Sequence, residues 1–198
     1  MYKIAISGKA NSGKDTVAKF FNEAYREINN TVICQTAMFA AFADPIKEIV
    51  RLMFPRTKRK MLFGPSNYRL ETIPGAFKDG KPLTFRTILQ DIGTQVGRGY
   101  IESVWLDALD FKLEKANKNN YKLFIVTDVR FRNEFDHLKN QGYTMVRVKR
   151  NAQLNMSHSS EKEQDSIKDS EFDFVISNDG TVGELYDKVL ETLKVLVP

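Results

Sequence analysis

A glycine-rich segment near the amino terminus constrains the fold of this chain more than any other feature. Gly8-Lys-Ala-Asn-Ser-Gly-Lys14 follows a short apolar and β-branched run at 2–6 and precedes a stretch of helical periodicity that starts at Asp15. The glycines let the backbone wrap tightly with its N–H groups toward phosphate oxygens, and the positive end of the helix dipole adds to that attraction. Strand, loop and helix in this order predict a phosphate loop at 8–14, with Lys14 on the β- and γ-phosphates of a nucleotide.

The residue after Lys14 departs from the usual pattern, which has Ser or Thr at that position to bind Mg²⁺. Asp15 stands there and Thr16 follows it. Asp15 is interpreted either as a Mg²⁺ ligand acting through water or as a cap of the helix, and the sequence leaves both open. The candidate nucleotide-binding residues of this region are Gly8, Ala10, Asn11, Ser12, Gly13, Lys14, Asp15 and Thr16.

Strand-like and helix-like segments alternate along the rest of the chain, which predicts an α/β fold with a mostly parallel sheet. The run at 122–127 is apolar throughout and is typical of a strand buried on both faces. Further strands are predicted at 31–36, 143–149 and 172–177, and helices are predicted to begin near Asp44, Phe85, Asn133 and Val182. Because ligands bind at the carboxyl ends of parallel strands, the polar segments that follow these strands are candidate site residues.

The length of 198 residues predicts a single domain with an insertion. The insertion is placed at about 55–115, and its first part, 55–85, is predicted to be irregular because it holds four prolines and three glycines. The basic cluster at 56–60 is interpreted as a solvated face or, if the chain binds nucleic acid, as a patch for the phosphate backbone. A polar stretch at about 151–169 has no core signal and is assigned to a short lid.

Composition excludes several classes of protein. The longest apolar run is far shorter than the ~20 residues that a membrane helix needs. Cys34 is the single cysteine, which excludes an internal disulfide framework and favours a reduced, cytoplasmic setting. The net charge of +5 attracts phosphorylated small molecules as well as nucleic acids, so charge alone does not choose between them.

The chain resembles the phage deoxynucleoside monophosphate kinases over nearly its whole length. Five blocks carry the resemblance in the same order: 7–17, 42–47, 89–98, 128–134 and 158–161. The resemblance implies a three-layer P-loop kinase fold with an acceptor-binding insertion and a short lid. It also implies a cytoplasmic enzyme that uses ATP and Mg²⁺ to phosphorylate deoxynucleoside monophosphates. Phosphomevalonate kinases and dephospho-coenzyme A kinases look distantly similar, so another phosphorylated metabolite remains an alternative acceptor.

The same resemblance, together with phosphoryl-transfer chemistry, assigns catalytic roles to Lys14, Asp15, Asp128 and Arg130. Asp128 suits Mg²⁺ held through water, as Asp15 and Thr16 do, and Arg130 can hold a phosphate with two parallel hydrogen bonds. The alternatives are a strand-end cap for Asp128 and a salt bridge for Arg130. Glu134 is interpreted as orienting Arg130 or the acceptor, or as stabilising the start of a helix.

The acceptor-binding residues implied by the resemblance lie mainly in the middle of the chain. The alternative for Lys47 is a solvated helix residue without acceptor contact, and the alternative for Trp105 is packing in the core. Asn178 and Thr181 either border the adenine of ATP or form a turn without ligand contact. The candidate acceptor-binding residues are Asp44, Lys47, Arg69, Gln90, Arg98, Trp105, Arg130 and Glu134.

The lid stretch is poor in arginine, so Arg147 and Arg150 are predicted to supply the positive charge, and His158 is interpreted as a cap of a lid helix. The expected partners are small-molecule nucleotides, with no membrane and no stable nucleic-acid partner, and a homodimer is left open. A P-loop ATPase that binds nucleic acid is the alternative from a different functional class, although no standard DNA-binding motif is visible.

Overall fold

The computed structural model describes residues 1–31, 36–151 and 164–197. Backbone contacts divide the chain into two compact units, which we name the sheet unit (Met1–Ala41 with Phe111–Pro198) and the inserted unit (Phe42–Asp110). The inserted unit contains most of the insertion predicted at about 55–115. Most of the predicted lid, His158 included, lies outside the described residues, as does Cys34.

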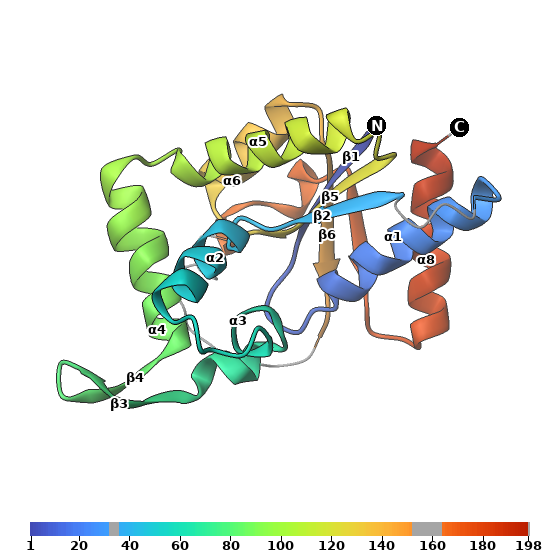
Figure 1. Ribbon diagram of the computed structural model, residues 1–198. Coiled ribbons are helices and arrows are strands. Elements are labelled where there is room, and N and C mark those ends of the chain that lie inside the picture. Colours follow the sequence, from blue (N-terminus) through green and yellow to red (C-terminus); the bar gives the residue numbers. More distant parts are fainter. Residues whose placement is uncertain (32–35, 152–163, 198) are drawn as a thin grey trace. The chain divides into compact units, whose positions relative to one another are not determined.

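The sheet unit is built on a five-stranded sheet in which every pairing is parallel (Figure 1). The predicted α/β fold with a mostly parallel sheet is therefore confirmed. The strands, in the order in which they pair, are β2 (Ala37–Ala40), β5 (Leu123–Val129), β1 (Tyr2–Ser7), β6 (Thr144–Lys149) and β7 (Phe174–Ser177).

The strand predicted at 31–36 lies mostly outside the described residues, and β2 is described from Ala37 to Ala40. Pairing with β5 starts at Ala37, opposite Leu123. The carbonyl group of Thr36 accepts from the backbone N–H groups of Lys122 and Leu123, so it forms the entry to the pairing rather than part of the strand.

Helices cover both faces of this sheet (Figure 1). Helices α1 (Lys14–Ile28) and α8 (Val182–Leu196) lie together on one face, and α6 (Arg132–Asn140) lies on the other with the carboxyl-terminal half of α5 (Val104–Lys118). Successive side chains of a strand point to opposite faces, so alternate residues of each strand join the core under α1 and α8. The strand residues in that core are Ile4, Ile6, Leu123, Ile125, Val146, Val148 and Ile176.

The inserted unit is more regular than its sequence suggests. The segment at 55–85, predicted to be irregular, contains two short helical turns and an antiparallel hairpin with a turn at Asp79-Gly80. Both turn residues have positive φ, 51° and 73°, which is the geometry that an Asp-Gly pair favours in two-residue hairpins. The elements of this unit are α2 (Asp44–Met53), α3 (Lys60–Phe63), η1 (Ser66–Leu70), β3 (Thr72–Lys78), β4 (Lys81–Thr84), α4 (Phe85–Gln90) and η2 (Asp91–Arg98).

The single tryptophan of the chain, Trp105 at the start of α5, packs against the π-helix η2. The indole Nε1 of Trp105 donates to the carbonyl oxygen of Gly93 at 2.8 Å. A Cβ atom added at Gly97 would lie 2.1 Å from Cζ2 of Trp105, so the ring occupies space that only glycine leaves open. Trp105 is 6% exposed and therefore packs as a core residue of this unit.

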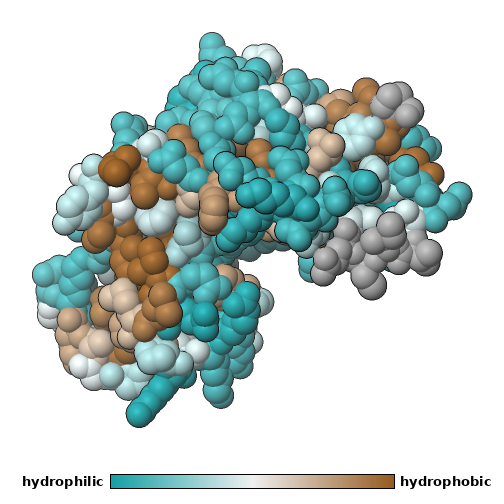
Figure 2. Space-filling view, turned by 45° about the horizontal axis from the view of Figure 1, so that its top comes forward, coloured by the Kyte–Doolittle hydropathy of each residue, from teal (hydrophilic) through white to brown (hydrophobic). Residues whose placement is uncertain are grey.

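The inserted unit also exposes large apolar side chains (Figure 2). Leu52 is 74% exposed, Phe77 68% and Tyr100 85%. Brown, hydrophobic surface gathers at the left of the view, over the elements of this unit. Within the described residues, no helix is both long enough and apolar enough to cross a membrane.

We expect Gly97→Ala to destabilise the protein by about 1–3 kcal/mol, the usual cost of forcing extra atoms into a packed site. Gly99→Ala is the matched control, because a Cβ atom there meets only the Thr94 carbonyl oxygen, at 3.9 Å. Its φ of −65° suits alanine, so the control should be neutral or slightly stabilising. Urea unfolding of both variants measures the difference, and equal stabilities would contradict this account of the packing at Trp105.

Candidate active site

The phosphate loop leads from β1 directly into α1. Gly13 occupies the N-cap position of α1 in a left-handed conformation, φ 93°, and Asn11 also has a positive φ of 60°. The first backbone N–H groups of a helix have no partner within the helix, so they can donate to a bound anion. The loop predicted from the sequence therefore has the backbone shape that phosphate binding requires.

The two glycines are needed because other atoms lie close to them. A Cβ atom at Gly8 would lie 2.5 Å from Oγ of Ser12 and 2.8 Å from the carbonyl oxygen of Val148. A Cβ atom at Gly13 would lie 2.2 Å from Nδ2 of Asn178. The loop is thus packed against the ends of two other strands, which limits how it can move.

Asn178 supports the loop from the end of β7. Its side-chain Nδ2 donates to the carbonyl oxygen of Ser12 at 2.8 Å, and its backbone N–H donates to the carbonyl oxygen of Lys149 at 2.7 Å. The side chain of Thr181 caps α8 by accepting from the backbone N–H of Glu184. Contact of Asn178 and Thr181 with adenine stays a prediction, whereas the support that Asn178 gives to the loop was missed from the sequence.

The side chains of the loop fit a bound triphosphate. The hydroxyl group of Ser12 is buried and has no hydrogen-bond partner among the described residues, in a loop whose backbone is shaped for an anion. Lys14 is the first residue of α1 and is partly exposed. A buried hydroxyl without a partner is costly, so a phosphate oxygen at this position would satisfy it.

Asp15 and Thr16 are both exposed in the first turn of α1. The N-cap residue is Gly13 and the helix has no side-chain cap, so N-capping is not the role of Asp15. Asp128, which is partly exposed, lies near the end of β5, and β5 pairs with β1. Carboxylate and hydroxyl oxygens suit Mg²⁺, which usually keeps several of its waters. Among the residues that the structure describes, no group of three or more His, Cys, Asp or Glu side chains could hold a metal ion.

Glu134 stabilises the turn that carries Arg130. Its carboxylate accepts from the backbone N–H groups of Arg130 at 2.9 Å and Phe131 at 3.1 Å. It is 2% exposed, so these contacts support helix-start stabilisation, which was one of its interpretations. Arg130 itself is exposed just beyond the end of β5.

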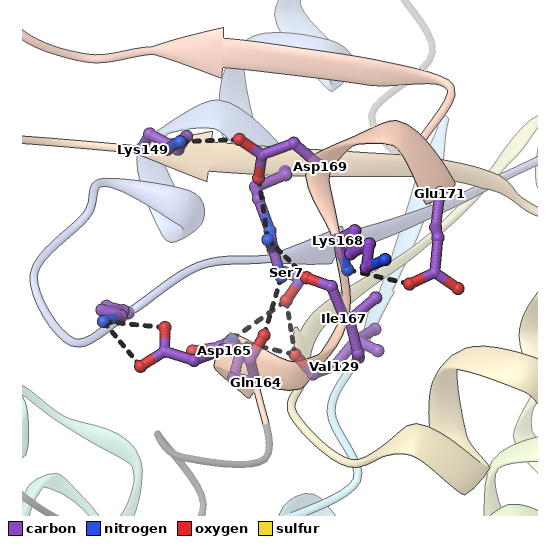
Figure 3. Close-up of polar contacts among 11 residues, drawn as sticks. Ser7, Val129, Lys149, Gln164, Asp165, Ile167, Lys168, Asp169 and Glu171 are labelled. Atoms are coloured by element: carbon purple, nitrogen blue, oxygen red, sulfur yellow. Dashed lines mark hydrogen bonds and ion pairs between the residues drawn. The ribbon is translucent and has the colours of Figure 1, made fainter.

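The segment at 164–171 is bound to the sheet by a network of polar contacts (Figure 3). The guanidinium group of Arg147, on β6, donates to the carbonyl oxygens of Gln164 and Ile167 and to the carboxylate of Asp169, each at 2.8 Å. Lys149 donates to the other oxygen of Asp169. The hydrogen bond from Lys149, and after it the one from Arg147, lowers the pKa of the Asp169 carboxyl below its usual range. The guanidinium group of Arg147 therefore anchors this segment, and the supply of positive charge by Arg147 and Arg150 stays a prediction.

A second contact joins this segment to the phosphate loop. The ammonium group of Lys9 lies 2.8 Å and 3.1 Å from the two carboxylate oxygens of Asp165. Both side chains are more than half exposed, so the pair contributes at most about 1 kcal/mol.

The inserted unit holds the acceptor candidates of the middle of the chain. Lys47 pairs with Asp44 at 3.3 Å and lies over the ring of Phe63, so it is not simply a solvated residue. Arg69 donates to the carbonyl oxygens of Leu62 and Gly64, which fixes the end of α3. Gln90 ends α4 and Arg98 ends η2, whereas Arg130 and Glu134 belong to the sheet unit. Acceptor contact by these residues stays a prediction.

We expect Gly13→Ala to weaken ATP binding about tenfold or more, because the added atom collides with Asn178 and displaces the loop at a cost of about 1–3 kcal/mol. Gly142→Ala is the matched control, since Gly142 also has positive φ, 73°, but has nothing within 4 Å of an added Cβ atom. The control should lose about 1–2 kcal/mol of stability and keep its ATP affinity. Calorimetric titration with ATP and Mg²⁺ tests both variants, and equal affinities would argue against ATP binding by this phosphate loop.

Comparison with known proteins identifies relatives of this chain. A family profile described as deoxynucleotide monophosphate kinase matches residues 68–189, which is more than half of the chain. A protein of Acanthamoeba polyphaga mimivirus, named provisionally as a deoxynucleotide monophosphate kinase, is 26% identical over 200 residues, covering 96% of this chain and 95% of that protein. The deoxynucleotide monophosphate kinase of Enterobacteria phage T4 is 37% identical over 115 residues, covering 56% of this chain and 46% of the phage protein.

Solved structures have the same fold. TT1252 from Thermus thermophilus has a TM-score of 0.50 at 16% identity, covering 100% of this chain and 98% of that one. A sugar kinase from Janibacter sp. HTCC2649 has a TM-score of 0.50 at 15% identity, covering 98% and 95%. At such low identity the likeness concerns the fold alone.

Proposed function

We propose that this chain, which belongs to the deoxynucleotide monophosphate kinase family, transfers the γ-phosphoryl group of ATP to a deoxynucleoside monophosphate. A phosphate oxygen of the acceptor attacks the γ-phosphorus, and the bond from that phosphorus to the β–γ bridging oxygen breaks. The products are ADP and a deoxynucleoside diphosphate. The observation that carries the proposal is a phosphate loop on β1 beside a strand, β5, that has Asp128 near its end and is followed directly by Arg130.

The sheet unit supplies the groups that act on ATP. The backbone N–H groups of the loop and the ammonium group of Lys14 bind the phosphates and stabilise the charge that spreads over the transferred group. Arg130, exposed beyond β5, is the group that holds the acceptor phosphate. Asp15, Thr16 and Asp128 would hold Mg²⁺, largely through water, and the ion would neutralise charge on the phosphate oxygens.

The inserted unit supplies the remaining acceptor groups in this proposal. Lys47 with Asp44, Gln90 and Arg98 are the groups that bind the acceptor nucleotide. The side chains of Trp105 and Arg69 donate to backbone carbonyl groups and so shape the unit, and their contact with the acceptor stays a prediction. The sequence resemblance and the half-buried Lys47–Asp44 pair support this assignment.

The decisive experiment measures ADP release over a panel of deoxy- and ribonucleoside monophosphates, with phosphomevalonate and dephospho-coenzyme A included. We expect ATP consumption to rise at least about tenfold over the acceptor-free rate with at least one deoxynucleoside monophosphate. Stimulation by phosphomevalonate or dephospho-coenzyme A alone would assign another acceptor, and stimulation by DNA or RNA alone would assign a nucleic-acid-dependent ATPase.

Lys14→Met tests whether this activity belongs to the phosphate loop. Loss of a group that stabilises transferring charge costs about 3–4 kcal/mol, so kcat should fall by about two to three orders of magnitude in a folded protein. Lys19→Met is the control, because Lys19 is an exposed lysine on the same helix. Near-normal turnover of Lys14→Met would remove the loop from the reaction.

Asp15→Asn tests the proposed metal role of the residue that departs from the usual loop pattern. The substitution keeps the size of the side chain and removes its charge, so we expect a lower kcat, a higher Mg²⁺ requirement and little change in melting temperature. Asp187→Asn, on the exposed face of α8, is the control. An unaltered Mg²⁺ titration for Asp15→Asn would show that Asp15 has no metal role.

A further inference from the structure

Three groups form a closed set of hydrogen bonds at the carboxyl ends of β1 and β5 (Figure 3). The hydroxyl group of Ser7 donates to the carbonyl oxygen of Val129 at 2.9 Å. Nε2 of Gln164 donates to the same carbonyl oxygen at 3.2 Å and to Oγ of Ser7 at 3.0 Å. Ser7 and Val129 are fully buried and Gln164 is 4% exposed, so water cannot replace these bonds.

The two residues that Gln164 joins adjoin the two halves of the candidate site. Ser7 is the last residue of β1 and precedes Gly8, the first residue of the phosphate loop. Val129 is the last residue of β5 and stands between Asp128 and Arg130. The geometry of this contact therefore sets how far the loop lies from Asp128 and Arg130.

The regular pairing of the two strands fails at the same place. Ala5 lies opposite Val126, but Ser7 lies opposite Val129, so β5 has one more residue than β1 over this stretch. A bulge of this kind turns the side chains of the bulged strand, and bulges recur next to active sites. The strand pairing alone thus does not fix the direction of Asp128, and the side chains of Ser7 and Gln164 supply the missing connection.

Gln164 is itself held in place from β6. Its carbonyl oxygen accepts from Arg147, which also binds Ile167 and Asp169 on the same segment. The next residue, Asp165, pairs with Lys9 of the phosphate loop. The segment therefore contacts the loop on its surface and the strand ends beneath it.

We propose that Gln164 is a positioning residue for phosphoryl transfer, which fixes the phosphate loop against Asp128 and Arg130 through Ser7 and Val129. This inference rests on the proposed function. The position requires a donor with two N–H groups, because both of its partners use their oxygen atoms as acceptors there. An apolar side chain of the same length preserves the packing but leaves the carbonyl group of Val129 with the Ser7 hydroxyl as its only partner in this set.

The test is Gln164→Met, with kcat, KM for both substrates, ATP affinity and melting temperature all measured. We expect kcat per folded site to fall about tenfold or more, since small displacements of reacting groups cost that much, while both KM values and the ATP affinity change by less than about threefold. Gln141→Met is the matched control, because Gln141 follows α6 and bonds to His137 on that helix. The control should keep kcat within about twofold of the wild type.

Ser7→Ala provides an independent readout of the same contact. Both substitutions break the same set of hydrogen bonds. The kcat of the double variant should therefore be close to that of the less active single variant, and the two losses should not multiply. If Gln164→Met does not fold, the fall of kcat at constant KM in Ser7→Ala carries the test alone.

Two results overturn the inference. Loss of melting temperature with unchanged kcat per folded site would make Gln164 a stability residue only, with the proposed function intact. Absence of nucleoside monophosphate-dependent ATP consumption in the wild type would overturn the proposed function, and the role of Gln164 with it.

Discussion

The loop between β1 and α1 can keep its conformation only because no side chain stands at Gly8 or Gly13. Oxygen and nitrogen atoms from Ser12, Val148 and Asn178 already lie within 3 Å of the positions that a Cβ atom would take. This close approach couples the loop to the ends of β6 and β7 as well as to β1. The polar contacts of 164–171 hold the same edge of the sheet from the side of β6.

The two units use different means to build their parts of the candidate site. In the sheet unit, side chains bond to backbone oxygens at strand ends, as Gln164 does at Val129 and Asn178 does at Ser12. In the inserted unit, a π-helix opens a space for an indole ring at Gly97. π-Helices are rare and recur at functional sites, because the wider turn exposes or redirects backbone groups. The first arrangement favours a rigid phosphate site, and the second gives a local fold that depends on the absence of a side chain at Gly97.

Sequence patterns predicted the features that depend on local backbone geometry and on strand burial. The phosphate loop, the parallel sheet and the polar end of β5 fall in this class, because glycine spacing and apolar runs encode them directly. The roles of Gln164, Asn178 and Arg147 could not be predicted, since each depends on a partner more than sixteen residues away in the chain. The hairpin at Asp79-Gly80 had a local signal that the surrounding prolines obscured.

The burial of Trp105 gives the protein a built-in optical probe. It is the single tryptophan of the chain, and it belongs to the inserted unit. Its indole ring is shielded from water and hydrogen-bonded to Gly93, so its emission will shift to longer wavelength when this unit opens. Far-ultraviolet circular dichroism reports on both units at once. Comparing the two signals during unfolding therefore distinguishes one cooperative transition from separate melting of the units.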